Sequence, residues 1–467
     1  MTTPTDDAAV TAKPALAQRA NRAALVDARG CPVGTGSARA IEHAEKGLWR
    51  MLSYYGNALD DLDAAIAEDP NWALAHVMKA NALLSMTEHG LGLLAADSLQ
   101  RAAELADAGH ANDRERHHIA ATRLCAAGQW QQACDAWERI LLDHPQDLVA
   151  LQVAHLFDFY RGDARNLHRR VARVLPEWSP QAPLYSFVLG MHAFGLEECN
   201  LYAPALDAGE AALALDARDP WAVHAVTHVN EMQGRYDEGA RFLASRSGDW
   251  SPDNGFAFHN WWHLALFRLE RCDTAGALAL LDERVMPGAE VALQRIDISA
   301  LLWRLRLMDV DLGERWNASA AGWPAAPEAG HYAFNDLHAV LSLVGAGQLD
   351  AAARVVEAAR ARSCEPSTLG TMSAEVGVPL TTGILAYGRG RFAETVEALW
   401  SVRDVCHRFG GSHAQRDLVD QTLMDAAIRA GQRRLAQHLL NERMLAKARS
   451  PLTQHWAARV GCAVLAN

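Results

Sequence analysis

Apolar positions along this chain follow the 3.6-residue period of an α-helix rather than the alternation of a β-strand. Leu59, Leu62 and Ile66 show the i, i+3, i+7 spacing of one helix face. The pattern stops at Asp69-Pro70 and starts again at Trp72. Because proline cannot continue a helix but suits the first turn of a new one, this punctuation predicts two successive helices.

Turn signals of two kinds recur between the helical segments. Pro70, Pro145 and Pro220 each end such a segment, and successive members of this set are 75 residues apart. The second signal is a glycine followed two residues later by a hydrophobic residue that opens a new helical pattern. It occurs at Gly128-Gln129-Trp130, Gly234-Arg235-Tyr236, Gly347-Gln348-Leu349 and Gly390-Arg391-Phe392.

These signals together predict the fold class. Glycine after a helix allows a left-handed cap, and the hydrophobic residue then packs back on the helix hairpin. A period of about 34 to 45 residues with paired helices is typical of tetratricopeptide-type repeats. One helix pair cannot bury its apolar face alone, so the pairs stack. We therefore predict an all-α protein, an α-solenoid or superhelix of degenerate tetratricopeptide-type helix-turn-helix repeats.

The helical pattern also predicts the domain organisation. Residues 1–36 are expected to be a partly ordered N-terminal arm, and residues 37–467 a single continuous helical-repeat domain with a central polar pocket. Three turn-rich stretches, 245–256, 322–330 and 363–379, interrupt the period. Because loops that interrupt a repeat array often carry function, we look for a site in the helices that follow them.

Composition excludes several classes of function. The chain has 467 residues, of which 50% are hydrophobic and 21% charged, as in ordinary folded proteins. A formal net charge of −12 without a basic tract argues against a nucleic-acid partner. The eight scattered cysteines lack a C-x-x-C pair, which indicates reduced thiols. No signal peptide and no membrane-length apolar run is recognisable, so we expect a cytoplasmic protein that does not insert into a membrane.

Two histidine pairs with i, i+4 spacing are the strongest candidates for chemistry. His224 and His228 share one helix face, and His259 and His263 share another. If the two helices face each other, these four imidazoles could bind zinc, iron or manganese. Neither pair has the H-E-x-x-H form of metalloproteases, and helix-borne histidines also occur as hydrogen-bonded interior residues. The sequence therefore requires no cofactor, although a divalent metal on these four residues fits it.

The same residues suit acid–base work on an organic molecule without a metal. Two later blocks, Phe334–His338 and Gly411–Asp417, add further polar groups. Either Asn335 or Asp336 is expected to be a helix N-cap, as is Ser412. The candidate catalytic residues are His224, His228, His259, His263, Asp336, His338, His413 and Asp417. The candidate substrate-binding residues are Trp261, Trp262, Asn260, Glu231, Phe334, Asn335, Gln415 and Arg416.

Four blocks of this sequence resemble the tetratricopeptide repeat protein 38 family, found in bacteria and animals. The blocks are Val226–Arg235, His259–Leu266, Phe334–His338 and Gly411–Asp417, and the resemblance extends over most of the chain from about residue 37. It implies an α-solenoid of degenerate repeats and does not supply an activity. Because bacterial members are similar to proteins encoded beside natural-product pathways, it also implies a small aromatic metabolite of secondary metabolism as ligand.

Two hypotheses about function follow. In the first, the superhelix closes a pocket into which all six candidate histidines point, and the protein binds a small, planar molecule and acts on it through histidine acid–base chemistry, with or without a metal. In the alternative, the protein is a scaffold that holds a partner peptide on its concave face, and the histidines are structural. Clustered groups with adjustable pKa favour the first, whereas the fold alone favours the second. A homodimer also fits, because repeat arrays have exposed ends.

Overall fold

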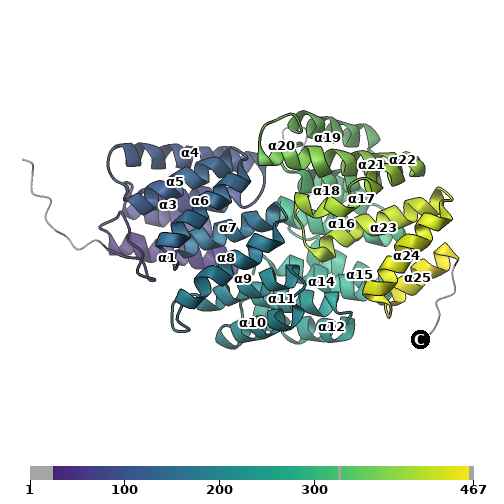
Figure 1. Ribbon diagram of the computed structural model, residues 1–467, viewed down its shortest axis with the longest axis horizontal. Coiled ribbons are helices and arrows are strands. Elements are labelled where there is room, and N and C mark those ends of the chain that lie inside the picture. The colour runs from purple at the N-terminus through teal and green to yellow at the C-terminus, as the bar shows by residue number, and fades with distance from the viewer. Residues whose placement is uncertain (1–24, 324–327, 462–467) are drawn as a thin grey trace, which may run out of the picture.

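A computed structural model of the chain describes residues 25–323 and 328–461, and within them it contains 25 α-helices and no β-sheet (Figure 1). The predicted all-α class is therefore confirmed. Of the predicted N-terminal arm, residues 1–24 lie outside the described residues. Residues 25–36 pack against the first helix, where Arg29 forms an ion pair with Glu45 at 2.7 Å, and Cys31 and Val33 are buried.

The helices of the first half are α1 (Ala38–Ser53), α2 (Ala58–Glu68), α3 (Ala73–Leu84), α4 (His89–Asp107), α5 (Asp113–Ala126), α6 (Trp130–Asp143), α7 (Leu148–Tyr160), α8 (Ala164–Val174), α9 (Tyr185–Glu198), α10 (Tyr202–Leu215), α11 (Pro220–Met232) and α12 (Tyr236–Ser245). Those of the second half are α13 (Ser247–Trp250), α14 (Ala257–Glu270), α15 (Thr274–Leu280), α16 (Ala292–Leu307), α17 (Arg315–Gly322), α18 (Ala333–Gly345), α19 (Leu349–Arg362), α20 (Thr368–Met372), α21 (Val378–Gly388), α22 (Phe392–Trp400), α23 (His413–Arg429), α24 (Arg433–Lys447) and α25 (Pro451–Val460). Short 3₁₀ or π segments are η1 (Leu175–Glu177), η2 (Leu281–Val285), η3 (Ser373–Gly377) and η4 (Arg403–Phe409).

The predicted turn signals separate the helices of antiparallel pairs. The four glycines of the second signal all have positive φ angles, between 70° and 74°, and a new helix follows each one. Cys272 occupies the same position between α14 and α15 with a φ of 59°, so this turn forms without glycine. At the proline signals, α2 ends at Glu68 and α11 begins at Pro220, with Asp219 as its N-cap. The α-solenoid of helix hairpins is confirmed.

The superhelix brings the two halves of the chain together. In Figure 1 the N-terminal helices lie opposite the C-terminal ones, with α9 to α14 below and between them. The side chain of Asn335 donates a hydrogen bond to the carbonyl oxygen of Thr87 at 2.9 Å. The amide of His413 donates one to Oε1 of Glu198 at 3.1 Å. These contacts between distant segments enclose an interior that an open solenoid would leave exposed.

The helices at this interior are buried on nearly all sides. In α11, for example, every residue from Pro220 to Glu231 is buried. A helix buried all round is normally apolar all round. Helices α11, α14, α16 and α23 instead carry histidine, carboxylate and amide side chains, and burying such groups is unfavourable unless they have partners. The interior where these helices meet therefore has the buried polar groups expected of a functional site.

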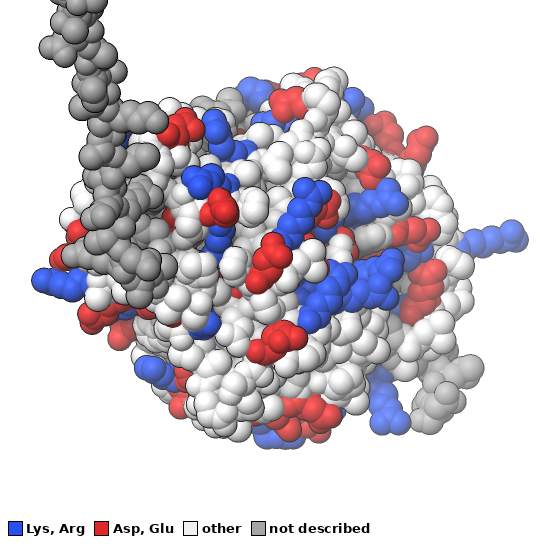
Figure 2. Space-filling view, turned by 60° about the vertical axis from the view of Figure 1, so that its left-hand side comes forward, with Lys and Arg blue, Asp and Glu red and all other residues white. Residues whose placement is uncertain are grey.

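One face of the molecule carries charged side chains of both signs (Figure 2). On the face in Figure 2, lysine and arginine side chains of the described residues are interspersed with aspartate and glutamate. This mixture is typical of an ordinary solvated surface. None of the helices within residues 25–323 and 328–461 is long and apolar enough to cross a membrane.

Candidate functional site

Four buried imidazoles meet where α11 packs against α14, and we call them the histidine cluster: His224, His228, His259 and His263. One nitrogen of each ring lies within 4.8 Å of a nitrogen of every other. Nε2 of His224 and Nε2 of His259 are 3.1 Å apart. The i, i+4 spacing places two rings on each helix, and the packing of the two helices brings the pairs together.

Two of the rings are held by carboxylates through their outward-facing nitrogens. Nδ1 of His259 hydrogen-bonds to Oδ2 of Asp297 on α16 at 2.7 Å. Nδ1 of His263 hydrogen-bonds to Oε2 of Glu231 on α11 at 3.1 Å. A carboxylate on Nδ1 fixes the ring orientation and keeps the proton on that nitrogen. Nε2 of both rings therefore carries its lone pair toward the middle of the cluster.

The third ring faces a pair of adjacent glutamates at the end of α9. Nδ1 of His228 lies 3.4 Å from Oε2 of Glu197, and both side chains are fully buried. Burial and the neighbouring Glu198 raise the pKa of Glu197 well above its ordinary value. Burial of Glu198 acts in the same direction, but Arg416 and His413 outweigh it and lower the pKa of Glu198. The pair thus combines one carboxyl group with a raised pKa and one with a lowered pKa.

Burial lowers the pKa of three of the four imidazoles and so favours their neutral form. It lowers the pKa of His228 to about 4 and those of His224 and His263 well below the ordinary value. It also raises the pKa values of Glu231 and Asp297. Neutral imidazole is the form of histidine that takes up a proton or a metal ion.

Trp262 and Asn260 lie beside the cluster, as their position on the same helix suggests. The indole ring of Trp262 stacks on His259, with ring centroids 5.3 Å apart and planes 12° apart. The guanidinium of Arg304 lies 5.5 Å over the same indole. Asn260 is fully buried, and neither its oxygen nor its nitrogen has a hydrogen-bond partner in the described part of the chain.

Trp261 points away from the cluster, which corrects the expectation that it forms a pocket wall there. Its Nε1 donates a hydrogen bond to Ser251 at 3.1 Å, and its ring packs on Trp250 at 4.7 Å. The reason is helical geometry, because residue 261 lies halfway between residues 259 and 263 and so faces the opposite side of α14.

A small cavity of about 70 Å³, here called the aromatic chamber, adjoins the histidine cluster. His224, His259 and Asp297 form one edge of it, and Phe334 and Gln415 lie in its wall. The other lining residues are mainly aromatic or aliphatic: Tyr54, Leu156, Phe159, Tyr160, Trp221, Phe256, Phe258, Leu293, Ile296, Tyr332 and Gly411. A space of this size holds about two water molecules, or a small planar molecule if the walls move apart.

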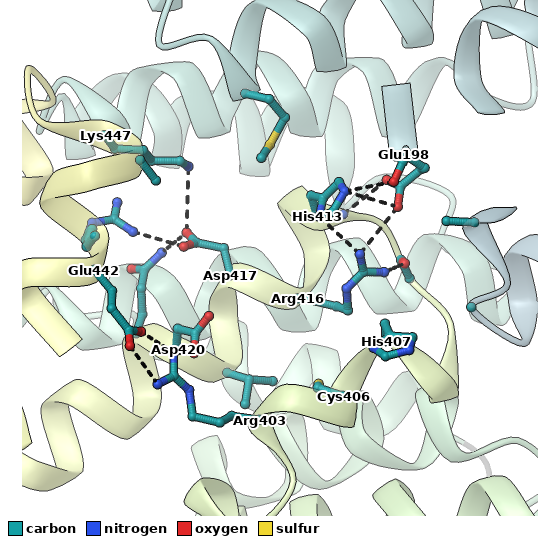
Figure 3. A pocket seen from close by; sticks show the side chains of 18 of the residues that line it. Glu198, Arg403, Cys406, His407, His413, Arg416, Asp417, Asp420, Glu442 and Lys447 are labelled. Atoms are coloured by element: carbon teal, nitrogen blue, oxygen red, sulfur yellow. Dashed lines mark hydrogen bonds and ion pairs between the residues drawn. The ribbon is translucent and has the colours of Figure 1, made fainter. Parts of the chain in front are cut away.

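A larger cavity of about 520 Å³, here called the polar cavity, lies next to the chamber and shares Phe159 and Gly411 with it. Figure 3 shows His413 and Arg416 directed at Glu198 on one side of this cavity, and Asp417 directed at Lys447 on the other. Charged groups of both signs therefore line it. Glu198 lines the polar cavity, and its neighbour Glu197 lies beside His228 of the histidine cluster.

The structure separates His413 and Asp417 from the histidine cluster and from each other. The two were expected to interact as an imidazole and its orienting carboxylate. Asp417 instead accepts hydrogen bonds from Gln421 at 2.6 Å and Arg443 at 2.9 Å. Glu198, which is distant in sequence, takes the place beside His413. Ser412 is the N-cap of α23, as predicted.

The block around residue 335 also has a different role from the one its sequence indicated. Tyr332 is the N-cap of α18, so the expectation of a cap at residue 335 or 336 is wrong. Asp336 accepts the amide hydrogen of Gly330 at 2.8 Å, and with Asn335 it lines a third cavity of about 320 Å³. His338 is buried against the Phe334 ring, with its Nδ1 2.7 Å from the Phe334 carbonyl oxygen. The expectation that six histidines share one pocket is thus corrected to four.

Several residues of the site were not predicted from the sequence. Asp297 is the only acidic residue of α16, and an acid between two isoleucines signals a buried partner. Glu197 and Glu198 end α9, where the helix dipole disfavours negative charge, so their position was also informative. Trp221 and Phe256 gave no such signal, because aromatic residues in a helical protein usually serve the core.

No protein-family model matches the chain. Among solved structures, the crystal structure of yeast Tom70 is similar over 88% of this chain and 90% of that chain, with 11% sequence identity and a TM-score of 0.41. The TPR domain of P58(IPK) is similar over 85% of this chain and 99% of that chain, with 13% identity and a TM-score of 0.20.

The class of protein follows from the chain's own architecture. Consecutive helix hairpins, joined by residues with positive φ angles and stacked into a superhelix, define a tetratricopeptide-like helical-repeat protein. Its distinguishing feature is an interior that holds a buried histidine cluster beside an aromatic chamber.

Proposed function

We propose that this helical-repeat protein binds a small, planar, mainly apolar molecule in the aromatic chamber, with one edge of the molecule against His224 and His259. The observation that carries the proposal is the lining of the chamber, which is aromatic on most sides and polar at one edge. Binding sites for small molecules commonly combine apolar walls with a few convergent polar groups. The polar edge orients the ligand, and the aromatic walls supply most of the binding energy.

The adjoining polar cavity fits a ligand that carries a polar substituent. Phe159 and Gly411 lie between the two spaces, so a molecule can place its ring in the chamber and its polar end toward Arg416 or His413. The resemblance to the tetratricopeptide repeat protein 38 family adds a small aromatic metabolite as the expected ligand class. Both considerations favour an aromatic ring with one polar arm.

The chemistry available at the polar edge is proton transfer. Asp297 holds His259 by its Nδ1, and Nε2 of His259 faces the interior at the rim of the chamber. An imidazole oriented by a carboxylate is a general acid–base arrangement. A ligand with an exchangeable proton beside Nε2 would be activated there, which makes the protein an acid–base enzyme on our proposal.

Indole is a suitable first probe, because it is planar and carries one N–H. We expect indole to bind the metal-free protein, measured by calorimetry and by a rise in melting temperature. Leu293→Phe adds bulk to the chamber wall and should weaken indole binding at least tenfold. Leu278→Phe makes the same change at a half-buried leucine of α15 outside the chamber and should leave binding unchanged. Absence of indole binding, or equal binding by both variants, would contradict the proposal.

The second candidate is the scaffold function, which the fold favours. Helical-repeat arrays commonly hold protein partners, and the polar cavity presents Arg403 and Glu442 among groups of both signs. A peptide with charged side chains would fit such a surface. If a partner is retained by the native protein and by Leu293→Phe but lost with Arg403→Glu, the scaffold function is supported. If indole displaces the partner, the two functions share one site.

A further inference from the structure

The buried nitrogens of the histidine cluster have too few partners within the protein. Nε2 of His228 and Nε2 of His263 lack hydrogen-bond partners among the described residues. Nε2 of His224 and Nε2 of His259 face only each other. Burying a polar group without a partner costs roughly 1–3 kcal/mol, and four such rings lie together here. A hydrogen bond between Nε2 of His224 and Nε2 of His259 would satisfy these two nitrogens only. Nε2 of His228 and Nε2 of His263 would still lack a partner among the described residues.

We propose that the histidine cluster is a binding site for one divalent first-row transition metal ion, held by Nε2 of His224, His228, His259 and His263. The spacing of the nitrogens fits this assignment. In a tetrahedral site with metal–nitrogen bonds of about 2.0–2.1 Å, neighbouring nitrogens are about 3.3 Å apart. The Nε2 atoms of His224 and His259 are 3.1 Å apart, and one nitrogen of every ring lies within 4.8 Å of the others. Metal binding would bring the remaining nitrogens to the same spacing.

Carboxyl groups lie behind three of the four rings. Asp297 and Glu231 accept hydrogen bonds from Nδ1 of their histidines, and Glu197 lies 3.4 Å from Nδ1 of His228. Metal-binding histidines almost always have such an oxygen partner on the nitrogen that does not bind the metal. The three carboxylates come from α16, α11 and α9, so the arrangement is built by the fold rather than by one local motif.

The donor set selects the class of metal. Four neutral imidazoles suit zinc, ferrous iron, cobalt, nickel or copper, whereas magnesium and calcium prefer oxygen ligands. Four histidines fill a tetrahedral zinc site, while iron accepts further ligands. His224 and His259 also line the aromatic chamber, so a further ligand on iron would come from the chamber. A metal ion there would occupy the lone pair of His259 Nε2, which could then no longer act as the base at the polar edge.

The test uses the full chain, stripped of metal with a chelator and titrated with Co²⁺ as a spectroscopic probe. We expect one Co²⁺ per chain, with visible ligand-field bands of a nitrogen-ligated ion, and competition by Zn²⁺ but not by Mg²⁺. His263→Gln removes one ligand and should weaken Co²⁺ binding at least 100-fold. His338→Gln is the matched control, because His338 is also buried with an unpartnered Nε2 but lies outside the cluster. This control should bind Co²⁺ within twofold of the native protein.

Glu231→Gln keeps all four proposed metal ligands. It therefore tests the metal site even if His263→Gln fails to fold. It should reduce Co²⁺ affinity about 10- to 100-fold, since it weakens the support of one ligand. No stoichiometric Co²⁺ binding, or equal binding by the native protein, His263→Gln and Glu231→Gln, overturns the metal site. Because indole binding is measured on metal-free protein, either proposal can fail without the other.

Discussion

Oδ2 of Asp297 lies 2.7 Å from Nδ1 of His259, although the two residues are 38 positions apart and belong to different helices. The bond joins α14 to α16 at the rim of the aromatic chamber. It sets which nitrogen of His259 faces the chamber, and both the proposed proton transfer and the proposed metal site depend on it.

Replacing Asp297 by leucine tests this dependence. The ring of His259 then loses its hydrogen-bond acceptor and can rotate or change tautomer, so we expect Co²⁺ affinity to fall about 10- to 100-fold. Asp297→Asn is the control, because its amide oxygen can still accept the Nδ1 proton, and it should retain most of the affinity. Calorimetric titration of both variants measures the difference. Equal losses would show that the charge of Asp297, rather than the orientation it imposes, supports the site.

A second prediction concerns Phe159, which lies between the chamber and the polar cavity. Phe159→Ala joins the two spaces, so a molecule larger than indole should fit. We expect 2-naphthol to bind this variant at least tenfold more tightly than it binds the native protein, as measured by calorimetry. Phe242→Ala removes a half-buried ring of α12 away from both cavities and serves as control. Tighter binding by both variants would point to general loosening of the protein.

The sequence predicted the features that depend on local spacing. Glycine turns such as Gly128 fix where helices end, because positive φ angles are cheap only for glycine. The i, i+4 pairs share a helix face whatever surrounds them, so His224 with His228 and His259 with His263 were predicted correctly as pairs. These are relations within one or two turns of the chain.

The parts that sequence reasoning missed depend on how distant helices pack. Asp297 reaches His259 only because α16 crosses α14, and Glu198 meets His413 only because the superhelix closes. No periodicity in one segment reports such a meeting. The expected pairing of His413 with Asp417 failed for the same reason, since Arg443 from another helix competes for the carboxylate. A repeat array with loose periodicity leaves its curvature, and hence its interior contacts, undetermined by sequence.

The closure of the superhelix can be tested at Gly162, which has a φ of 67° in the turn after α7. A Cβ there would lie 1.7 Å from the carbonyl oxygen of His407, so the backbone of η4 would have to move. Gly162→Ala should therefore destabilise the protein by about 3 kcal/mol or more. Gly347→Ala has the same left-handed conformation, with nothing within 4 Å of the added Cβ, and should cost only about 1 kcal/mol. Urea unfolding measures both, and similar losses would contradict tight packing of the turn on η4.

The last prediction concerns acid stability at Asp147, a fully buried carboxylate far from the site. Arg114 donates to it at 2.6 Å, Nε2 of His118 lies 2.8 Å away, and the amide of Ala150 donates at 3.0 Å as part of the N-cap of α7. Burial alone would raise the pKa of Asp147, but Arg114 and His118 outweigh it and hold the pKa well below the ordinary value. The carboxylate therefore stabilises the fold above the unfolded-state pKa of about 3.9, and this contribution is lost as the pH falls from there toward the folded-state pKa.

Asp147→Asn keeps the helix cap but removes the nearer of two carboxylates beside Arg114, since Asp27 remains 3.6 Å away. It should cost about 3 kcal/mol at pH 7. Below about pH 4, the free energy of unfolding of the native protein falls by about 1.4 kcal/mol per pH unit more than that of the variant. The reason is that Asp147 takes up a proton on unfolding, whereas the asparagine of the variant does not. The stability gap between the two proteins should thus narrow from pH 4.5 to pH 3. Urea unfolding across that range measures the gap, and a constant gap would show that Asp147 does not carry the charge that its contacts indicate.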